Sequence, residues 1–347
     1  MVNSRARLAF YAFSHFAVDL CCFIALYSGA VGSARAALWV LIYNALAFGL
    51  QTPLGALADG FDDVRPLAAL GLGLVALGTL AQGRFLACVL LLGVGNALFH
   101  VSGAVATLRD RPGDALRAGV YVAPGALGVA CGILSAGPDG LSRAMCVLLL
   151  LVCVLTILAV GPGAPRGVAV RETPREPLPL GAGALMLCLA AVGVRSFAGF
   201  SADLPKLLFL GALASFAGKL LGGMAGRKLG WNALSLLCVG VGGLIMAFFP
   251  GARIIYVGVL LFNFAMPLTL AAVMKSLPGH AGLGFGLTTL ALLLGWLPLV
   301  SLETGYDAPK YLMAGLTLAA ALVLFLIFKY KKPDPVIQEE KDHDAAS

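Results

Sequence analysis

Residues 85–108 read FLACVLLLGVGNALFHVSGAVATL and contain no Asp, Glu, Lys or Arg. A helix of this length rises about 36 Å, at about 1.5 Å per residue, which is enough to cross a hydrocarbon core of about 30 Å. Similar runs follow one another along the chain: of its 347 residues, 60% are hydrophobic and 12% are charged. Soluble domains carry about 25% charged residues. We therefore predict an all-α integral membrane protein, because unpaired backbone groups exclude open sheets from a bilayer.

The apolar runs predict twelve transmembrane helices in two groups of six. The long connection 161–180 is rich in Pro, Arg and Glu, and we interpret it as a cytoplasmic linker between an N-terminal bundle, 1–160, and a C-terminal bundle, 181–330. Residues 331–347 are expected to form a disordered cytoplasmic tail. The predicted helices are 8–31, 36–58, 67–83, 85–108, 116–136, 141–160, 181–202, 205–226, 230–250, 252–275, 280–302 and 309–329.

The distribution of Lys and Arg predicts the orientation in the membrane, because cytoplasmic loops carry the excess of these residues. We expect the cytoplasmic (inner) membrane, with both termini in the cytoplasm. The net charge of +7 is then a consequence of topology, and nucleic-acid binding is not expected. The predicted cytoplasmic residues are Arg5, Arg7, Arg65, Arg109, Arg111, Arg117, Arg166, Arg171, Arg175, Arg227, Lys228, Lys275, Lys329, Lys331 and Lys332, whereas the other side holds Arg35, Arg84, Arg143, Lys206, Arg253 and Lys310.

The eight cysteines all lie inside apolar runs and lack the spacing of a metal site. We interpret them as small buried hydrophobic residues and expect no metal and no cofactor. No segment indicates an obligate protein partner, so a monomer in the lipid bilayer is expected.

The two groups of six helices are related by features that recur at an offset of 166 or 167 residues. Any one match could arise by chance in a chain rich in Gly and Ala, but the shared register favours an internal duplication. A repeat of six plus six helices is typical of transporters whose substrate site lies between the halves. The matched pairs are Gly55–Asp59 with Gly222–Gly226, Asn96 with Asn263, and Pro112–Ala115 with Pro278–Ala281.

The segments that follow predicted spans 2 and 8 are GALADGFDDVR (55–65) and GGMAGRKLG (222–230). Both are similar to G-x-L-A-D-R-x-G-R, the turn found after spans 2 and 8 in the major facilitator superfamily, which the sequence resembles over nearly its whole length. The first copy keeps the acidic residue and lacks the Arg beside it. The second copy keeps the basic pair and has Gly226 in place of the acid. The resemblance implies two six-helix bundles that move a small molecule by alternating access.

Within that superfamily, the sequence looks most like the fosmidomycin-resistance type of exporter. This resemblance rests on SHFAVD (14–19), on FH (99–100), and on MP (266–267) with PG (278–279). The sequence departs from the type at Val101, where Pro usually follows Phe-His. GVYVAPGALG (119–128) is also similar to an element in span 5 of drug/proton antiporters.

A carboxylate and two imidazoles are predicted to lie at membrane depth. Asp19 is some eleven residues into the first span, about 17 Å along a helix, and His15 lies one turn earlier on the same face. His100 lies in span 4. Charged groups at this depth are costly and usually face a cavity or one another, so we predict that Asp19, His15 and His100 couple transport to protons. The alternative is a structural ion pair or interhelical hydrogen bond.

Other polar residues within the spans are candidates for substrate binding. Arg195 lies in span 7, the counterpart of span 1, where it would pair with Asp19, bind an anionic group or extend to the outer interface. Asn96 and Asn263 would line the cavity or form matched interhelical hydrogen bonds. The complete predicted set is Arg195, Asn96, Asn263, Asn44, Gln51, Tyr121 and Trp296.

A third set of residues is predicted to form conformational or gating contacts near the turns after spans 2 and 8. Lys219 belongs to this set, although it lies near the predicted cytoplasmic end of span 8 and its side chain would reach the interface there. The set is Gly55, Asp59, Arg65, Lys219, Gly222, Arg227 and Lys228.

These features favour a secondary transporter of a small molecule, with proton-coupled efflux by antiport as the preferred direction. The first alternative is uptake of a small organic anion with protons, anchored by Arg195. An intramembrane enzyme using His and Asp is less favoured, because one catalytic dyad gives no reason for two related halves. A receptor or assembly factor that does not transport is the remaining alternative. The expected partners are therefore the substrate, protons and lipid.

Overall fold

The computed structural model describes residues 4–30, 34–137, 140–171, 176–201, 208–301 and 309–328. The described parts of the first half contain α1 (Ser4–Ala30), α2 (Ala36–Asn44), the π-helical turn η1 (Ala45–Gly49), α3 (Gln51–Asp59), α4 (Arg65–Leu80), the 3-10 turn η2 (Ala81–Gly83), α5 (Phe85–Leu108), α6 (Ala115–Leu134) and α7 (Arg143–Ala159). The second half contains α8 (Ala182–Ser201), α9 (Leu208–Gly226), α10 (Trp231–Phe248), α11 (Ile255–Asn263), α12 (Ala265–Lys275), α13 (Ala281–Ser301) and α14 (Lys310–Ile327).

The predicted all-α membrane fold is confirmed. Eleven helical stretches among the described residues are long and apolar enough to cross a membrane, and α7, with 17 residues, is a shorter apolar helix that makes the twelfth. The predicted ranges end within a few residues of the observed helices. The predicted tail 331–347 and the basic residues Arg175, Lys206, Lys329, Lys331 and Lys332 lie outside the described residues, so they stay predictions.

Two of the predicted spans are not regular helices. Span 2 consists of α2, η1 and α3, and span 10 consists of α11 and α12. Proline accounts for both irregularities, because it has no N–H with which to bond the carbonyl four residues earlier. Pro53 leaves the carbonyl of Gly49 at the end of η1 without its helical donor, and Pro267 does the same to Asn263, the last residue of α11.

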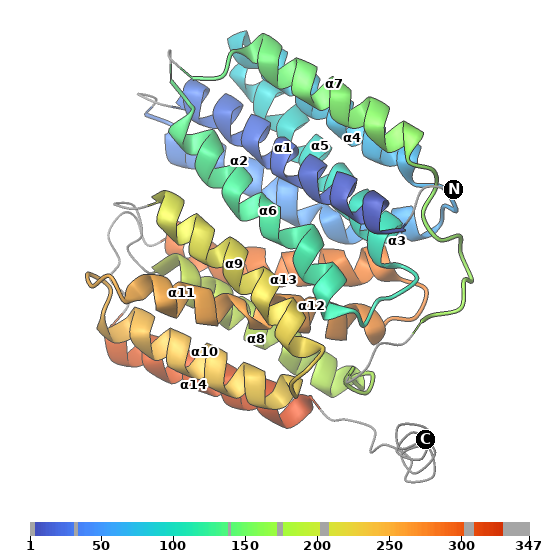
Figure 1. The fold of residues 1–347 in the computed structure, drawn as a ribbon. Coiled ribbons are helices and arrows are strands. Elements are labelled where there is room, and N and C mark those ends of the chain that lie inside the picture. The colour runs from blue at the N-terminus through green and yellow to red at the C-terminus, as the bar shows by residue number, and fades with distance from the viewer. Residues whose placement is uncertain are drawn as a thin grey trace, which may run out of the picture.

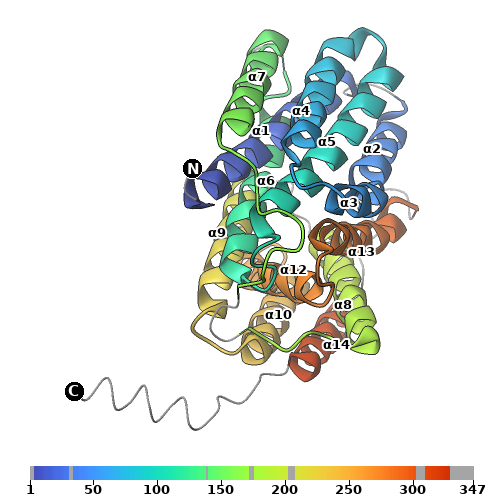
Figure 2. The same ribbon diagram turned by 90° about the vertical axis from the view of Figure 1, so that its right-hand side faces the viewer.

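The helices form two bundles that lie side by side, α1–α7 above and α8–α14 below in Figure 1. Two helix pairs join the bundles along most of their length, α6 with α9 and α3 with α13. The view in Figure 2 places α3 directly beside α13. The remaining large contacts, such as α1 with α6 and α10 with α14, are within one bundle.

Glycine permits the close approach of the two bundles. A Cβ atom on Gly55 of α3 would meet the backbone of Gly282 in α13, and the reverse is also true. At the other pair, a Cβ on Gly223 of α9 would meet the backbone of Ala115 in α6. Small residues are the usual means by which membrane helices approach closely.

The linker crosses one end of the molecule, which we call the linker end. On the side of the first half, Arg7 donates a hydrogen bond from Nη1 to the carbonyl of Pro162 at 3.0 Å. On the side of the second half, Lys275 Nζ donates to Glu176 Oε2 at 2.6 Å, and both side chains are largely buried. The linker is thus attached to each bundle by a separate contact.

Candidate functional site

Four polar side chains from two neighbouring helices meet inside the first bundle. Helix α1 supplies His15 and Asp19, and α5 supplies Asn96 and His100, in each case one helical turn apart. All four residues are buried, with no more than 8% of their surface exposed. We call these four residues the central cluster. Its position fits the prediction that Asp19, His15 and His100 act together.

The carboxylate of Asp19 is shared among the other three side chains. Asn96 donates from Nδ2 to Asp19 Oδ1 at 3.0 Å. His15 Nε2 lies 3.4 Å from Oδ2, and His100 Nε2 lies 3.7 Å from Oδ1. The two imidazoles contact each other through their Nε2 atoms, which are 2.9 Å apart. A buried carboxylate is stable only when it is paired in this way.

The hydrogen bonds fix the number of protons on the two imidazoles. His100 Nδ1 lies 2.8 Å from the backbone carbonyl of Asn96, which can only accept, so Nδ1 carries a hydrogen. Only one further proton fits between the two Nε2 atoms. The remaining nitrogen, His15 Nδ1, is buried without a hydrogen-bond partner in the structure. The central cluster therefore has one open position for a proton, and filling it neutralises the charge of Asp19.

Helix α6 completes the wall of the central cluster. Gly125 of α6 lies against the ends of the His15 and Asp19 side chains, where a Cβ atom would collide with both. Tyr121 of α6 is fully buried and donates from its hydroxyl to the carbonyl of His100 at 2.8 Å. Tyr121 was predicted as a substrate-binding residue. The structure places its hydroxyl on the backbone of His100 and its ring 5.0 Å from the His15 ring, edge to face.

Arg195 lies in the second bundle on α8. It donates from Nη2 to the carbonyl of Phe262 at 2.8 Å, at the end of α11, and its guanidinium lies 5.2 Å from the centre of the Phe262 ring. Its Nε atom is buried without a partner in the structure. Asp19 forms its ion pairs with His15 and His100. The structure therefore does not contain the direct Asp19–Arg195 pair that the sequence offered as one alternative.

Lys219 lies on α9, half-buried, and is the cation that connects the two bundles electrostatically. Its charge is attracted by Asp19 of the first bundle and repelled by Arg195 of the second. The structure contains no hydrogen bond or ion pair between Lys219 and another described residue. Among the described residues, the cations Lys219 and Arg195 and the carboxylate of Asp19 therefore affect one another electrostatically.

The other predicted binding residues do not join the central cluster. Asn263 accepts a hydrogen bond at Oδ1 from Ser215 Oγ of α9 at 3.1 Å. This is the interhelical hydrogen bond that was the alternative to a place in the cavity. Gln51 donates to the carbonyl of Ala47 in its own span, and its Oε1 atom is buried without a partner in the structure. The side chains of Asn44 and Trp296 make no hydrogen bond to another described residue.

Two of the predicted gating residues form polar contacts between the bundles at the linker end, in addition to the approach of Gly55 to Gly282. Asp59, the last residue of α3, accepts hydrogen bonds from the backbone amides of Gly282 (2.8 Å) and Leu283 (2.9 Å) at the start of α13. Arg227, just after α9, donates from Nε and Nη2 to the two carboxylate oxygens of Asp114. Each carboxylate lies at the positive end of a helix dipole. These two contacts, which we call the two clamps, close the linker end.

The remaining gating residues have local contacts. Arg65 holds Asp63 through both carboxylate oxygens, and these hydrogen bonds hold the pKa of the Asp63 carboxyl below its usual value. Gly222 lies against the backbone of Phe264 within the second bundle. Lys228 is exposed. These three residues do not bridge the bundles in the structure.

Sequence reasoning missed the role of Asp114, although the signal was present. The pair Pro112–Ala115 was noted only as part of the repeat. Asp directly before a helix is a strong N-cap signal, and Asp114 Oδ1 accepts from the amides of Leu116 and Arg117. What the sequence did not indicate is that Arg227 would reach the same carboxylate from the other bundle.

Replacing Asp114 is expected to separate its two roles. Asp114→Asn keeps an oxygen for the helix cap and removes the charge that holds Arg227, whereas Asp114→Ala removes both. The loss of an N-cap costs about 1 kcal/mol, so Asp114→Ala should be less stable than Asp114→Asn by about that amount. Chemical unfolding of the purified protein measures the difference. Asp62→Ala, which breaks an exposed pair with Arg166, is the control and should change stability little. Equal stability of the two Asp114 variants would contradict the cap.

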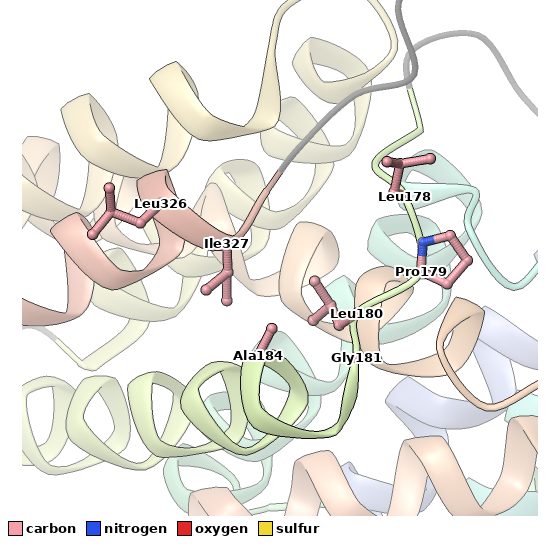
Figure 3. Close-up of a pocket in the computed structure, with 7 residues that line it drawn as sticks. All are labelled: Leu178, Pro179, Leu180, Gly181, Ala184, Leu326 and Ile327. Atoms are coloured by element: carbon pink, nitrogen blue, oxygen red, sulfur yellow. The ribbon is translucent and has the colours of Figure 1, made fainter.

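A pocket elsewhere in the structure has a different character. It lies between the start of α8 and the end of α14, and its lining includes Leu180, Ala184 and Ile327 (Figure 3). The lining contains no titratable side chain. The pocket therefore has no means of binding a proton or a charged group.

The sequence predicted no metal site, but the central cluster brings three possible ligands together. One ligand atom each from His15, Asp19 and His100 lies within 4.8 Å of the others, and all three residues are buried. Imidazole nitrogen and carboxylate oxygen are ligands of divalent transition metals. The chemistry of this group is taken up below.

Comparisons with known proteins identify the fold. No protein-family model matches the sequence, and no curated protein matches it significantly. Among solved structures, the chain is similar to the human organic anion transporter MFSD10 (TETRAN), with a TM-score of 0.67 and 18% identity over 93% of this chain and 100% of that chain. It is also similar to the E. coli fucose:proton symporter FucP, with a TM-score of 0.66 and 15% identity over 94% of this chain and 98% of that chain. A second structure of FucP, described as a major facilitator superfamily transporter in the outward conformation, has a TM-score of 0.64 at 14% identity and covers 92% of this chain and 100% of that chain. The chain therefore has the fold of the major facilitator transporters.

Proposed function

We propose that this protein is a secondary active transporter that moves a small molecule across the cytoplasmic membrane by alternating access. The observation that carries the proposal is the central cluster, a buried carboxylate with two imidazoles and one open proton position, inside one of the two helix bundles. Buried ionisable residues in membrane proteins are costly and are usually functional. The similarity in fold to solved transporters supports the same conclusion.

Protons are the proposed coupling ion, and antiport with efflux is the proposed direction. The Asp19 carboxylate is shared by Asn96 and the two imidazoles, so a substrate group that competes for it weakens the binding of the proton. By linkage, the proton then weakens the binding of the substrate to the same degree. Mutual exclusion of this kind is what antiport requires. The two clamps supply the contact that must open when the halves rock.

Uptake of a small organic anion with protons is the second candidate, and the charges of the second bundle favour it. Lys219 and Arg195 place two cations opposite the single carboxylate of Asp19. One of the solved structures with this fold is described as an organic anion transporter, and another as a fucose:proton symporter. An intramembrane enzyme is not favoured, because one catalytic dyad gives no reason for two related halves. We further propose a monomer with both termini in the cytoplasm.

A ligand screen followed by a flux measurement tests the proposal. A panel of organic anions and of drug-like cations is first screened for thermal stabilisation of the purified protein, since a ligand that binds the native state raises the unfolding temperature. The stabilising compound is then followed in proteoliposomes with and without a pH gradient. Antiport predicts that a proton gradient directed into the compartment drives the compound out of it. Symport predicts the opposite direction, and flux indifferent to the gradient would contradict proton coupling.

Arg195→Gln is expected to weaken the binding of an anionic ligand and to leave a cationic ligand unaffected. Gln keeps a donor for the carbonyl of Phe262 but removes the charge. A hydrogen bond to a charged group contributes about 1.5–3 kcal/mol, which corresponds to a loss of affinity of roughly 10- to 150-fold. Calorimetric titration of the ligand measures the change. An anion that binds both proteins equally would exclude Arg195 as its anchor.

A further inference from the structure

The three ligand atoms of the central cluster converge on a single point. We propose that His15, Asp19 and His100 bind a divalent transition-metal ion of the zinc type, in place of the proton that lies between the two imidazoles. This site shares its residues with the proposed function, but it is defined by ligand geometry and does not need transport to occur.

The donor set matches that of a metal site with an open position. Catalytic zinc sites use three protein ligands, often two His and one carboxylate, and leave the fourth position to water or another ligand. Here the three ligands come from two helices, with His15 and Asp19 one turn apart on α1 and His100 on α5. Their separation along the helices allows all three to face one ion.

The distances between the ligand atoms fit a single ion. The Nε2 atoms of His15 and His100 are 2.9 Å apart, Asp19 Oδ2 lies 3.4 Å from His15 Nε2, and Asp19 Oδ1 lies 3.7 Å from His100 Nε2. One ligand atom from each of the three residues lies within 4.8 Å of the other two. Ligands held at about 2.0–2.1 Å from zinc are separated by about 3.3 Å in tetrahedral geometry and by about 2.9 Å in octahedral geometry. The separation of the two Nε2 atoms already fits one ion, and a rotation of the Asp19 carboxylate brings one oxygen toward both imidazoles.

The surroundings orient two of the ligands for the ion. His100 donates from Nδ1 to the carbonyl of Asn96, which leaves the lone pair of Nε2 directed at the cluster. Asn96 Nδ2 also holds one oxygen of Asp19. Such partners of the ligands fix their tautomer and orientation. His15 has no equivalent partner, because its Nδ1 atom is buried without one in the structure.

Metal and proton exclude each other at this site. Both Nε2 atoms must offer lone pairs to the ion, so the proton between them moves to the vacant Nδ1 atom of His15 when the metal binds. Metal binding therefore fills the open proton position, and it releases a proton only from a cluster that already carries the second one. The proposal also predicts that Zn²⁺ inhibits any flux that depends on protonation of the central cluster.

Cobalt binding to the full-length protein tests the site directly. The purified protein is treated with a chelator, freed of it, and titrated with Co²⁺, whose visible absorption reports tetrahedral nitrogen and oxygen ligands. Zn²⁺ is then added as competitor, and calorimetry in buffers of different protonation enthalpy counts the released protons. We expect a saturable band at one ion per chain that Zn²⁺ abolishes. Absence of a saturable band in the unmodified protein would overturn the proposal.

Substitutions distinguish this site from adventitious binding. His15→Ala and His100→Ala should weaken Co²⁺ binding by more than roughly 100-fold, and Asn96→Ala, which affects only the surroundings, by roughly 10- to 100-fold. His280→Ala is the matched control, because His280 is exposed and lies outside the cluster, and it should bind Co²⁺ like the unmodified protein. Asp19→Asn, which conserves volume, serves if an alanine variant is not monodisperse. Equal binding by all variants, or an equal loss in His280→Ala, would contradict the proposed ligands.

The test of the metal site and the test of the proposed transport function can fail independently of each other. Metal binding is measured without any transported compound. A protein that binds Co²⁺ at this site but shows no proton-dependent flux would refute the proposed function alone. A protein with proton-dependent flux and no Co²⁺ band would refute the metal site alone.

Discussion

Asp19→Asn is expected to reduce proton-driven flux of the identified substrate to the level of protein-free liposomes. Asn can still accept a hydrogen bond from Asn96, so the packing of the central cluster is conserved. It cannot balance the charge of a protonated imidazole pair, and an unpaired imidazolium in the bundle interior is costly. The open proton position at His15 would then stay empty in both states of the transporter, and a proton gradient would have nothing to act on.

A second flux measurement shows whether Asp19→Asn affects coupling or the whole transport cycle. Exchange of labelled for unlabelled substrate needs no net movement of protons, so it should continue in the variant. The unfolding temperature should not fall, because replacing a buried ionic group by a neutral one of equal volume is often neutral or stabilising. Asp62→Asn, an exposed acid in the loop after α3, is the control and should retain coupling. Unchanged proton-driven accumulation in Asp19→Asn would refute the assignment of the proton to this cluster.

Gly55→Val is expected to have the largest effect on the closure of the linker end. The added side chain would collide with the backbone of Gly282, and backbone cannot move aside as the end of a flexible side chain can. The helices α3 and α13 must then separate, which breaks the hydrogen bonds of Asp59 to the start of α13. Overpacking of this kind costs about 1–3 kcal/mol, enough to shift a balanced two-state equilibrium by roughly 5- to 150-fold.

Gly73→Val is the matched control for Gly55→Val. Gly73 lies on α4, and a Cβ atom there would meet nothing within 4 Å, so the same substitution should be tolerated. Spin labels at positions 62 and 228, in exposed loops of the two bundles at the linker end, report the distance between the halves. The distance distribution should shift to longer values in Gly55→Val and stay unchanged in Gly73→Val. Similar distributions in both variants would show that the glycine contact does not hold the linker end closed.

The sequence predicted the local partners of the central cluster but not their assembly. His15 and Asp19 are four residues apart, as are Asn96 and His100, and this spacing alone places each pair on one helical face. That α1 and α5 pack together with these faces in contact depends on contacts far apart in the chain. The 2.9 Å approach of the two imidazoles, and hence the single open proton position, follows only from that packing.

The two degenerate turns also show what the sequence predicted and what depended on the tertiary structure. The sequence predicted that 55–65 and 222–230 correspond, and it left unexplained why the first has an acid without its Arg and the second has a basic pair without an acid. In the structure, each clamp contains one carboxylate. At one clamp Asp59 accepts from bare backbone amides of α13, and at the other Asp114 accepts from Arg227. The acid missing from the second turn is thus supplied by Asp114 of the other bundle, whereas backbone amides at the start of α13 take the place of the Arg missing from the first turn.

The sequence by itself determined the all-α membrane class of the protein and the positions of its spans, and it predicted the duplication into two halves. These follow from composition and from helical periodicity, which depend on neighbouring residues and on the bilayer as solvent. Only the tertiary structure decided which charges meet. It placed Arg195 on the carbonyl of Phe262 and Lys219 within the electrostatic reach of Asp19. Such pairings join residues 67 to 200 positions apart, and no local pattern specifies them, because they depend on how whole helices pack.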